Sequence, residues 1–146
     1  MLGATSGGYM LLRPDSRGLC AAREQIRRVA KGLHIPPDEA DYLLIAVGEA
    51  VSNAFRHGTP DPSRNLIRLS WHHGVDALVV MIKDDGDGFD ANSTSSGSER
   101  FGATARGIEL MRACADEVYL LTEGGGKVVL HKRVRPVSAA SPTRIE

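Results

Sequence analysis

The chain has 146 residues, and its 18 lysines and arginines balance its 18 aspartates and glutamates, so the formal net charge is zero. This length is that of one domain with a single core, and a neutral balance does not favour the basic surface that a nucleic-acid partner requires. No apolar run approaches the ~20 residues of a membrane span, and residues 1–8 lack the pattern of a signal peptide. We therefore expect a cytoplasmic protein that binds neither nucleic acid nor membrane.

The first part of the chain predicts a short strand and two helices. Residues 9–13 are apolar enough for a strand, and Asp15 or Ser16 can cap the helix that follows, because each accepts a hydrogen bond from free amides of a first turn. Gly32 marks the end of that helix. Residues 37–57 repeat apolar side chains at intervals of three and four, which predicts a second helix with one buried stripe.

The second part of the chain predicts four strands, one helix and a long polar loop. Apolar periodicity places the strands at 65–73, 77–82, 116–122 and 128–134, and the helix at 106–115. The segment 90–105 is rich in Ser, Thr, Gly and Asn and is too long for an ordinary turn, so it is either functional or disordered. Three consecutive glycines at 124–126 predict a hairpin turn between the last two strands.

Hairpin-connected strands and grouped helices together predict an α+β fold. We expect a two-layer sandwich in which the helices cover one face of a mixed, mostly antiparallel sheet. The domain is expected over residues 9–135, with flexible tails at 1–8 and 136–146. Cys20 and Cys114 both fall in apolar helical patterns, so we expect two buried, reduced thiols.

The second predicted helix carries a polar stripe besides its apolar one. Glu49, Asn53 and His57 are spaced four residues apart, so they stack along one helix face. The neighbouring Ala46 and Ala50 leave room for another group to approach. A carboxylate, a carboxamide and an imidazole in line can coordinate a divalent cation, position a nucleophile and orient phosphate oxygens. Taken alone, the stripe is more typical of an ordinary solvated helix surface.

Two glycine-containing motifs follow. Asp84, Gly86 and Gly88 come directly after a buried strand, where the carboxylate can accept a hydrogen bond from an exocyclic amine and the glycines let the backbone approach a flat ring. An acidic surface turn is the alternative. Arg106 and Gly107 then lie where the polar loop meets a helix, and free amides at a helix amino terminus attract anions.

These three blocks, in this order, resemble the GHKL superfamily of ATPases. The Glu49 to Gly58 block is similar to its N box, the Asp84 block to its first glycine box, and Ala105-Arg106-Gly107-Ile108 to its second. The resemblance extends from about residue 12 to residue 134. The His-Gly ending of the N box and the short Ser-rich loop are most similar to the anti-sigma-factor serine/threonine-protein kinases of bacteria.

The resemblance implies a site for ATP and Mg²⁺ within a Bergerat-type ATP-binding fold. Asn53 would coordinate the cation, and Glu49 would act as the base or orient the attacking hydroxyl. Asp84 would bind the adenine amine, while the two glycines that follow it, Gly86 and Gly88, would pack their backbone against the base.

The second glycine box would meet the phosphates beneath a lid formed by residues 90–105. Arg106 and Gly107 would contact the phosphates, and Ile108 belongs to the same box. His57 would either contact the nucleotide or cap its helix end, where a cationic imidazole is favoured. The box usually begins with glycine, and here that position is Ala105.

The resemblance also implies partners. The expected activity is that of an ATP-dependent anti-sigma factor and serine/threonine kinase that holds a sigma factor and phosphorylates an anti-anti-sigma protein of the STAS type. The alternative is a nucleotide-gated partner-binding module with little or no kinase turnover, to which Ala105 gives weight. A homodimer is expected, with the amphipathic first helix and the apolar strand at 9–12 as a candidate interface.

Overall fold

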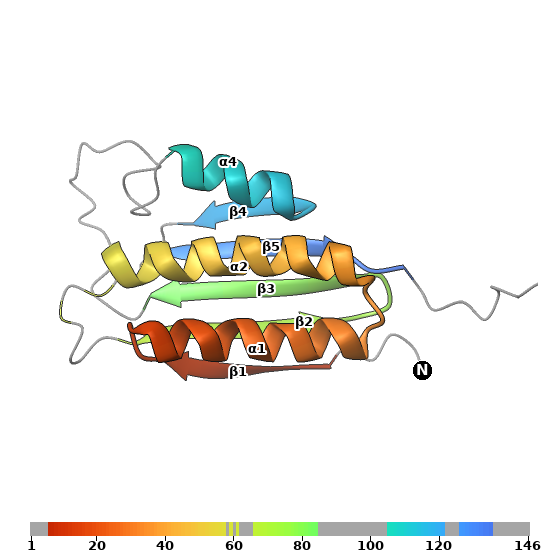
Figure 1. Ribbon diagram of the computed structural model, residues 1–146, viewed down its shortest axis with the longest axis horizontal. Coiled ribbons are helices and arrows are strands. Elements are labelled where there is room, and N and C mark those ends of the chain that lie inside the picture. Colours follow the sequence, from red (N-terminus) through yellow and green to blue (C-terminus); the bar gives the residue numbers. More distant parts are fainter. Residues whose placement is uncertain are drawn as a thin grey trace, which may run out of the picture.

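The structure is a computed structural model that describes residues 6–57, 59, 61, 66–84, 105–121 and 126–135 (Figure 1). The elements in chain order are β1 (Ser6–Leu12), α1 (Ser16–Gly32), α2 (Pro37–His57), β2 (Ile67–His73), β3 (Ala77–Asp84), α4 (Ala105–Cys114), β4 (Glu117–Leu121) and β5 (Lys127–Arg133). Several predicted features lie outside the described residues, namely Gly86, Gly88, the lid at 90–104, the glycines at 124 and 125, and the tails at 1–5 and 136–146.

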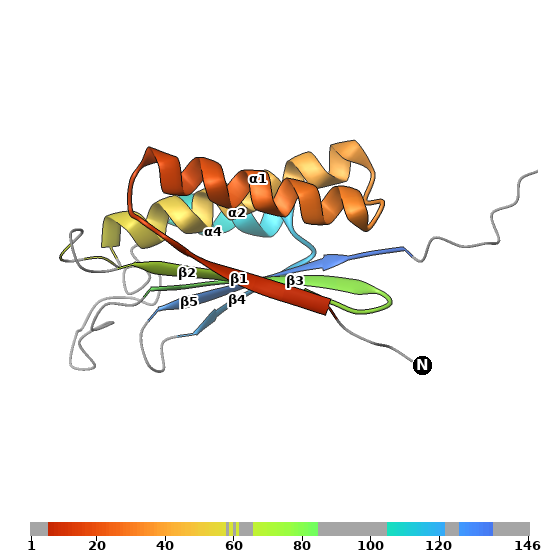
Figure 2. The ribbon, with the colours of Figure 1, turned by 90° about the horizontal axis from the view of Figure 1, so that it is seen from below.

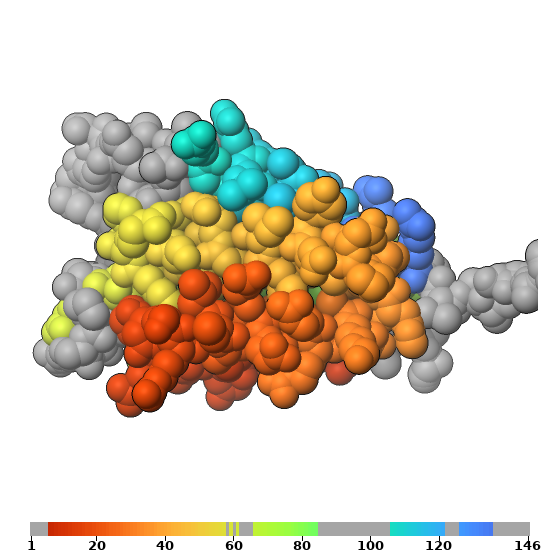
Figure 3. Space-filling model, viewed as in Figure 1, coloured from red at the N-terminus to blue at the C-terminus, as the bar shows by residue number. Residues whose placement is uncertain are grey.

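The strands form one five-stranded sheet in the order β1-β2-β3-β5-β4. Each of the four neighbouring pairs is antiparallel, so the described sheet is antiparallel throughout rather than mixed. The helices α1, α2 and α4 all cover the same face, as the side view shows (Figure 2). They lie next to one another over that face (Figure 3). The predicted α+β two-layer sandwich, with its helices on one face, is confirmed.

The core lies between the helices and the sheet. Its largest fully buried side chains come from both layers: Leu12, Ile26, Leu43, Leu44, Ile67, Leu69, Leu78, Ile82, Met111 and Leu130. Buried and half-buried residues alternate along the whole of β3, because successive side chains of a strand point to opposite faces. Asp84, the last residue of β3, therefore points to the helix-covered face. No helix in the described part of the chain is long and apolar enough to cross a membrane.

Helix α1 begins after one of the two predicted N-cap residues. The Asp15 side chain accepts a hydrogen bond of 2.9 Å from the Gly18 amide, so Asp15 and not Ser16 is the N-cap. The buried positions of α1 recur every four residues from Gly18 and Ala22 onward. Cys20 falls between those two, on the opposite side of the helix, and is exposed. The prediction of a buried thiol was therefore wrong for Cys20, whereas Cys114 is buried, and desolvation raises the pKa of its thiol.

The strand boundaries extend beyond the apolar runs. β1 begins at Ser6 rather than at residue 9, because Gly7 and Gly8 pair with His72 and Trp71 of β2. β3 likewise continues past its apolar run to Asp84. Backbone pairing, and not side-chain hydrophobicity, decides where these strands start and end.

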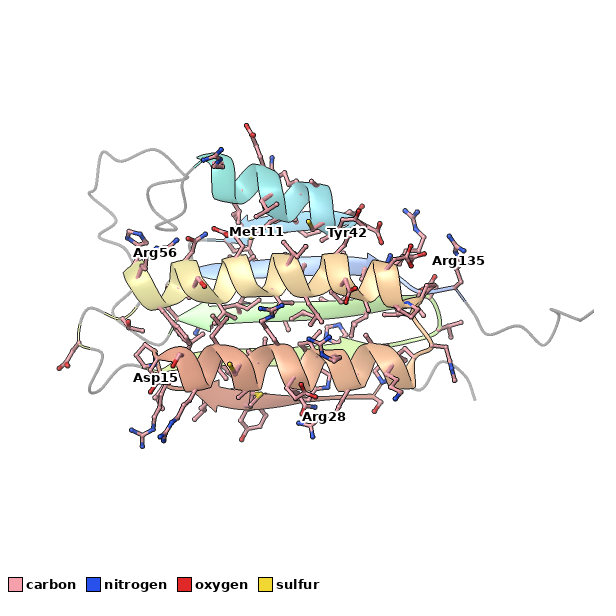
Figure 4. All side chains as sticks on the ribbon, viewed as in Figure 1. Asp15, Arg28, Tyr42, Arg56, Met111 and Arg135 are labelled. Carbon is pink, nitrogen blue, oxygen red and sulfur yellow. The ribbon has the colours of Figure 1, made fainter. Side chains whose placement is uncertain are left out.

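An ion-pair cluster joins α2 to the sheet at the end where α2 begins. The Lys132 ammonium of β5 lies 2.7 Å from a Glu39 carboxylate oxygen and 3.7 Å from an Asp116 oxygen. Lys132 is only 8% exposed, so its charge is well shielded from water. Arg135 lies at the same end, opposite to Arg56 (Figure 4). This cluster anchors the first turn of α2 away from the polar stripe.

Gly18 of α1 lies too close to its surroundings to admit a side chain without movement. A Cβ atom there would lie 2.1 Å from the Arg13 carbonyl oxygen and 3.2 Å from the Phe55 ring. We predict that Gly18→Ala lowers the free energy of unfolding by about 1–3 kcal/mol, because backbone must move to admit the methyl group. Thermal unfolding measures this. Gly32→Ala, in the same helix but with no atom within 4 Å of its Cβ, should leave the midpoint unchanged or raise it; equal midpoints for the two variants would contradict the packing described.

Candidate nucleotide site

The polar stripe of α2 points away from the core, but two of its three side chains are shielded from solvent. The apolar stripe of the same helix, which includes Leu43 and Val47, is fully buried and fixes the rotation of the helix. Asn53 is only 2% exposed, and Glu49 is half-buried. His57 is the last residue of α2 and is exposed. Burial thus separates Glu49 and Asn53 from an ordinary polar helix surface.

The amino terminus of α4 covers these two side chains. A Cβ atom on Gly107 would lie 2.7 Å from the Oε2 atom of Glu49 and 3.3 Å from the Nδ2 atom of Asn53. Gly107 is itself buried. Met111, one turn later, is fully buried and packs α4 against α2 (Figure 4). The structure therefore brings the first and third predicted blocks into direct contact, and a side chain at Gly107 would have to displace the Glu49 carboxylate.

The Asn53 amide is held on one side only. Its Oδ1 atom accepts a hydrogen bond from the Arg56 guanidinium. Its Nδ2 atom is buried and has no hydrogen-bond partner among the described residues. A buried donor without a partner costs about 1–3 kcal/mol, so the site suits a ligand with acceptor oxygens. Phosphate oxygens fit the donor, and a hard cation such as Mg²⁺ fits the amide oxygen. The residues present thus fit a Mg²⁺–nucleotide.

Asp84 is held in place by the turn between β4 and β5. The Gly126 amide donates to its Oδ2 atom at 2.9 Å, and the Asp84 amide donates to the Gly126 carbonyl at 3.0 Å. Asp84 is 5% exposed. β3 ends on the side of the molecule where α2 ends and α4 begins (Figure 1). The second predicted block thus starts at the same end as the other two, although Gly86 and Gly88 lie outside the described residues.

The remaining residues of the second glycine box differ in their surroundings. Arg106 is exposed in the first turn of α4, where it adds positive charge to that of the helix amino terminus. The Ile108 side chain instead packs against the core between the layers. Ala105 is the first residue of α4.

Two residues of the site were missed from the sequence. Arg56 donates a hydrogen bond to Asn53 from one helical turn away, a spacing that is visible in the sequence. Gly126 holds Asp84 from 42 residues away. Only the register of β3 with β5, in which Lys83 faces Lys127, would have revealed that second contact.

We predict that Gly107→Ala weakens binding of Mg²⁺–ATP by about tenfold or more while the protein stays folded. The new methyl group displaces the Glu49 carboxylate and crowds Asn53, yet alanine is favoured over glycine in a helix by about 1 kcal/mol. Calorimetric titration measures the affinity. Gly48→Ala is the matched control, because its Cβ would meet only a carbon atom of Arg23, at 3.8 Å. Unchanged affinity in Gly107→Ala would place the nucleotide elsewhere.

Comparison with known proteins agrees with this geometry. Proteins named serine-protein kinase RsbW are similar to the chain: that of Bacillus velezensis is 27% identical over 142 residues, covering 88% of each chain. The Bacillus subtilis protein is 27% identical over 113 residues, which cover 71% of each chain. The Oceanobacillus iheyensis protein is 24% identical over 131 residues, which cover 84% of this chain and 82% of the relative. Residues 12–132 match the family described as histidine kinase-like ATPase domain, and the chain therefore belongs to that family.

Proposed function

We propose that the chain is an ATP-dependent anti-sigma factor and serine/threonine kinase that phosphorylates an anti-anti-sigma antagonist. One observation carries the proposal: the α4 amino terminus, at Gly107, lies against the Glu49 carboxylate and the Asn53 amide of α2. This contact puts an anion-binding helix end, a candidate base and a candidate metal ligand within one small volume. The family is an ATPase domain family, which supports the use of ATP.

The phosphates are bound by the chain through charge and free amides. In this proposal the Asn53 amide oxygen would hold Mg²⁺, which would supply positive charge to the phosphates, and the first turn of α4 would present backbone amides to them. Arg106 adds a mobile cation, because its side chain is exposed beside that turn. The Asp84 carboxylate accepts a hydrogen bond from the adenine amine, and the hydrogen bond from the Gly126 amide holds that carboxylate in position. His57, Gly86 and Gly88 complete the proposed nucleotide contacts, and Ile108 supports the start of α4 by packing against the core.

Phosphoryl transfer depends mainly on positioning and on stabilisation of charge. The γ-phosphoryl group passes from the ADP oxygen to a serine or threonine oxygen of the antagonist, and Glu49 accepts the hydroxyl proton. Glu49 is suited to this task because it is half-buried and sits one helical turn from Asn53. Such a base contributes roughly 10²- to 10⁴-fold to the rate.

The proposed partners are a sigma factor, which the protein holds, and a STAS-type antagonist, which it phosphorylates. The kinase part is supported by the RsbW relatives, which are named serine-protein kinases. The anti-sigma part is supported by the resemblance of the motifs. The acceptor hydroxyl belongs to the antagonist in this account.

A nucleotide-gated binding module with little or no turnover is the second candidate. Ala105 favours it, because this residue begins α4, where the family pattern has glycine. Alanine has fewer accessible backbone conformations than glycine, which restricts how the backbone can enter the first turn of α4. In this candidate, turnover is reduced more than nucleotide binding.

One experiment tests both candidates. The protein is incubated with Mg²⁺–ATP and extract of its source cells, and captured proteins and their phosphosites are identified by mass spectrometry. We predict a captured partner newly phosphorylated on Ser or Thr, with the signal lost in Asn53→Ala and reduced about 10²-fold or more in Glu49→Gln, which should still bind ATP. A partner captured without phosphate, and released according to the nucleotide, would instead favour the binding module.

A homodimer through β1 is part of the proposal. β1 is an edge strand, and its outward-facing Tyr9 and Leu11 are 59% and 54% exposed. Exposed apolar edge strands tend to pair with another chain. We predict that sedimentation equilibrium gives a dimer for the wild type and a monomer for Leu11→Lys. Val75→Lys, at an exposed apolar residue of the β2–β3 turn, is the control and should remain dimeric; a dimeric Leu11→Lys would exclude this interface.

A further inference from the structure

Arg56 is hydrogen-bonded to the Asn53 oxygen that the proposed function assigns to Mg²⁺. Its guanidinium donates to the Oδ1 atom of Asn53, one helical turn earlier on α2. The acceptor belongs to a side chain that is 2% exposed, whereas Arg56 itself is exposed and lies at the very end of α2 (Figure 4). A permanently charged group thus reaches from the surface into the proposed metal site.

The two sides of the Asn53 amide have different neighbours. Its nitrogen faces Gly107 at the start of α4, and Glu49 lies against the same glycine. Its oxygen faces Arg56. A carboxamide oxygen is a suitable ligand for a hard cation, but it cannot serve a guanidinium and a metal at the same place, since like charges at close range repel.

We propose that Arg56 is a built-in cation that competes with Mg²⁺ for the Asn53 amide oxygen and substitutes for part of the metal's charge when the metal is absent. The inference rests on the proposed function, in that it requires a nucleotide bound with Mg²⁺ at Asn53. Arg56 then sets how strongly nucleotide binding depends on the metal, and is a positioning residue rather than a catalytic one.

Two effects of opposite sign follow. Without Mg²⁺, Arg56 is the cation beside the phosphates, so its removal weakens binding of ATP. With saturating Mg²⁺, the guanidinium must leave Asn53, so its removal leaves affinity unchanged or raises it. The ratio of the two affinities therefore increases in Arg56→Gln. A simple phosphate contact would lower both affinities, and a purely structural role would change neither.

The experiment is calorimetric titration of ATP in EDTA and in saturating MgCl₂. We expect Arg56→Gln to increase the ratio of metal-bound to metal-free affinity by about tenfold, the effect of one lost charge-assisted hydrogen bond. Arg56→Lys keeps the charge and should restore most of the metal-free affinity. Arg28→Gln removes an exposed arginine of α1, distant from this end of α2 (Figure 4), and should match the wild type.

The outcomes separate the inference from the proposed function. A ratio in Arg56→Gln within twofold of wild type, or an equal loss under both conditions, overturns the inference alone. If Asn53→Ala retains the full Mg²⁺ dependence, the metal assignment is wrong. If the wild type binds no ATP under either condition, the proposed function fails and the inference with it. Thermal unfolding of each variant verifies that it is folded.

Discussion

The packing of α2 on the sheet is the constraint on which the rest of the structure depends. Leu43, Leu44, Val47 and Val51 are buried almost completely between the layers, and a rigid helix with one face fixed has its other faces fixed as well. Glu49 and Asn53 are therefore directed at Gly107 of α4. A substitution in the apolar stripe would change the site by rotating the helix.

The two ends of the molecule are held together by different interactions. At one end, the close approach of Gly107 to Glu49 and the bond between Gly126 and Asp84 join segments that are far apart in the chain. At the other end, the buried Lys132 cluster ties the first turn of α2 to β5. The second end is thus held by ion pairs, and the site end by close backbone contacts at two glycines.

The sequence predicted α2 to the residue, because its apolar repeat is long and regular and Pro37 starts it. It also placed Glu49 and Asn53 on one stripe, which needs only helical geometry. Contacts that depend on how the strands pair could not be predicted from the sequence. The Asp84–Gly126 bond requires the β3–β5 pairing. The turn after α1 shows the same limit on a local scale: Gly32 ends the helix, yet it is His34 that takes the left-handed conformation, at φ 59°.

The central claim is that α2 and α4 form one metal–nucleotide site, and paramagnetic NMR tests it most directly. Mn²⁺, which accepts the same oxygen ligands as Mg²⁺, is added at low stoichiometry with ATP to ¹⁵N-labelled protein. The account predicts that the Asn53 and Gly107 amide signals broaden first, while those around Lys132, at the opposite end of the molecule, stay sharp. Broadening centred on Lys132, or sharp signals at Asn53 and Gly107 with nucleotide bound, would contradict it.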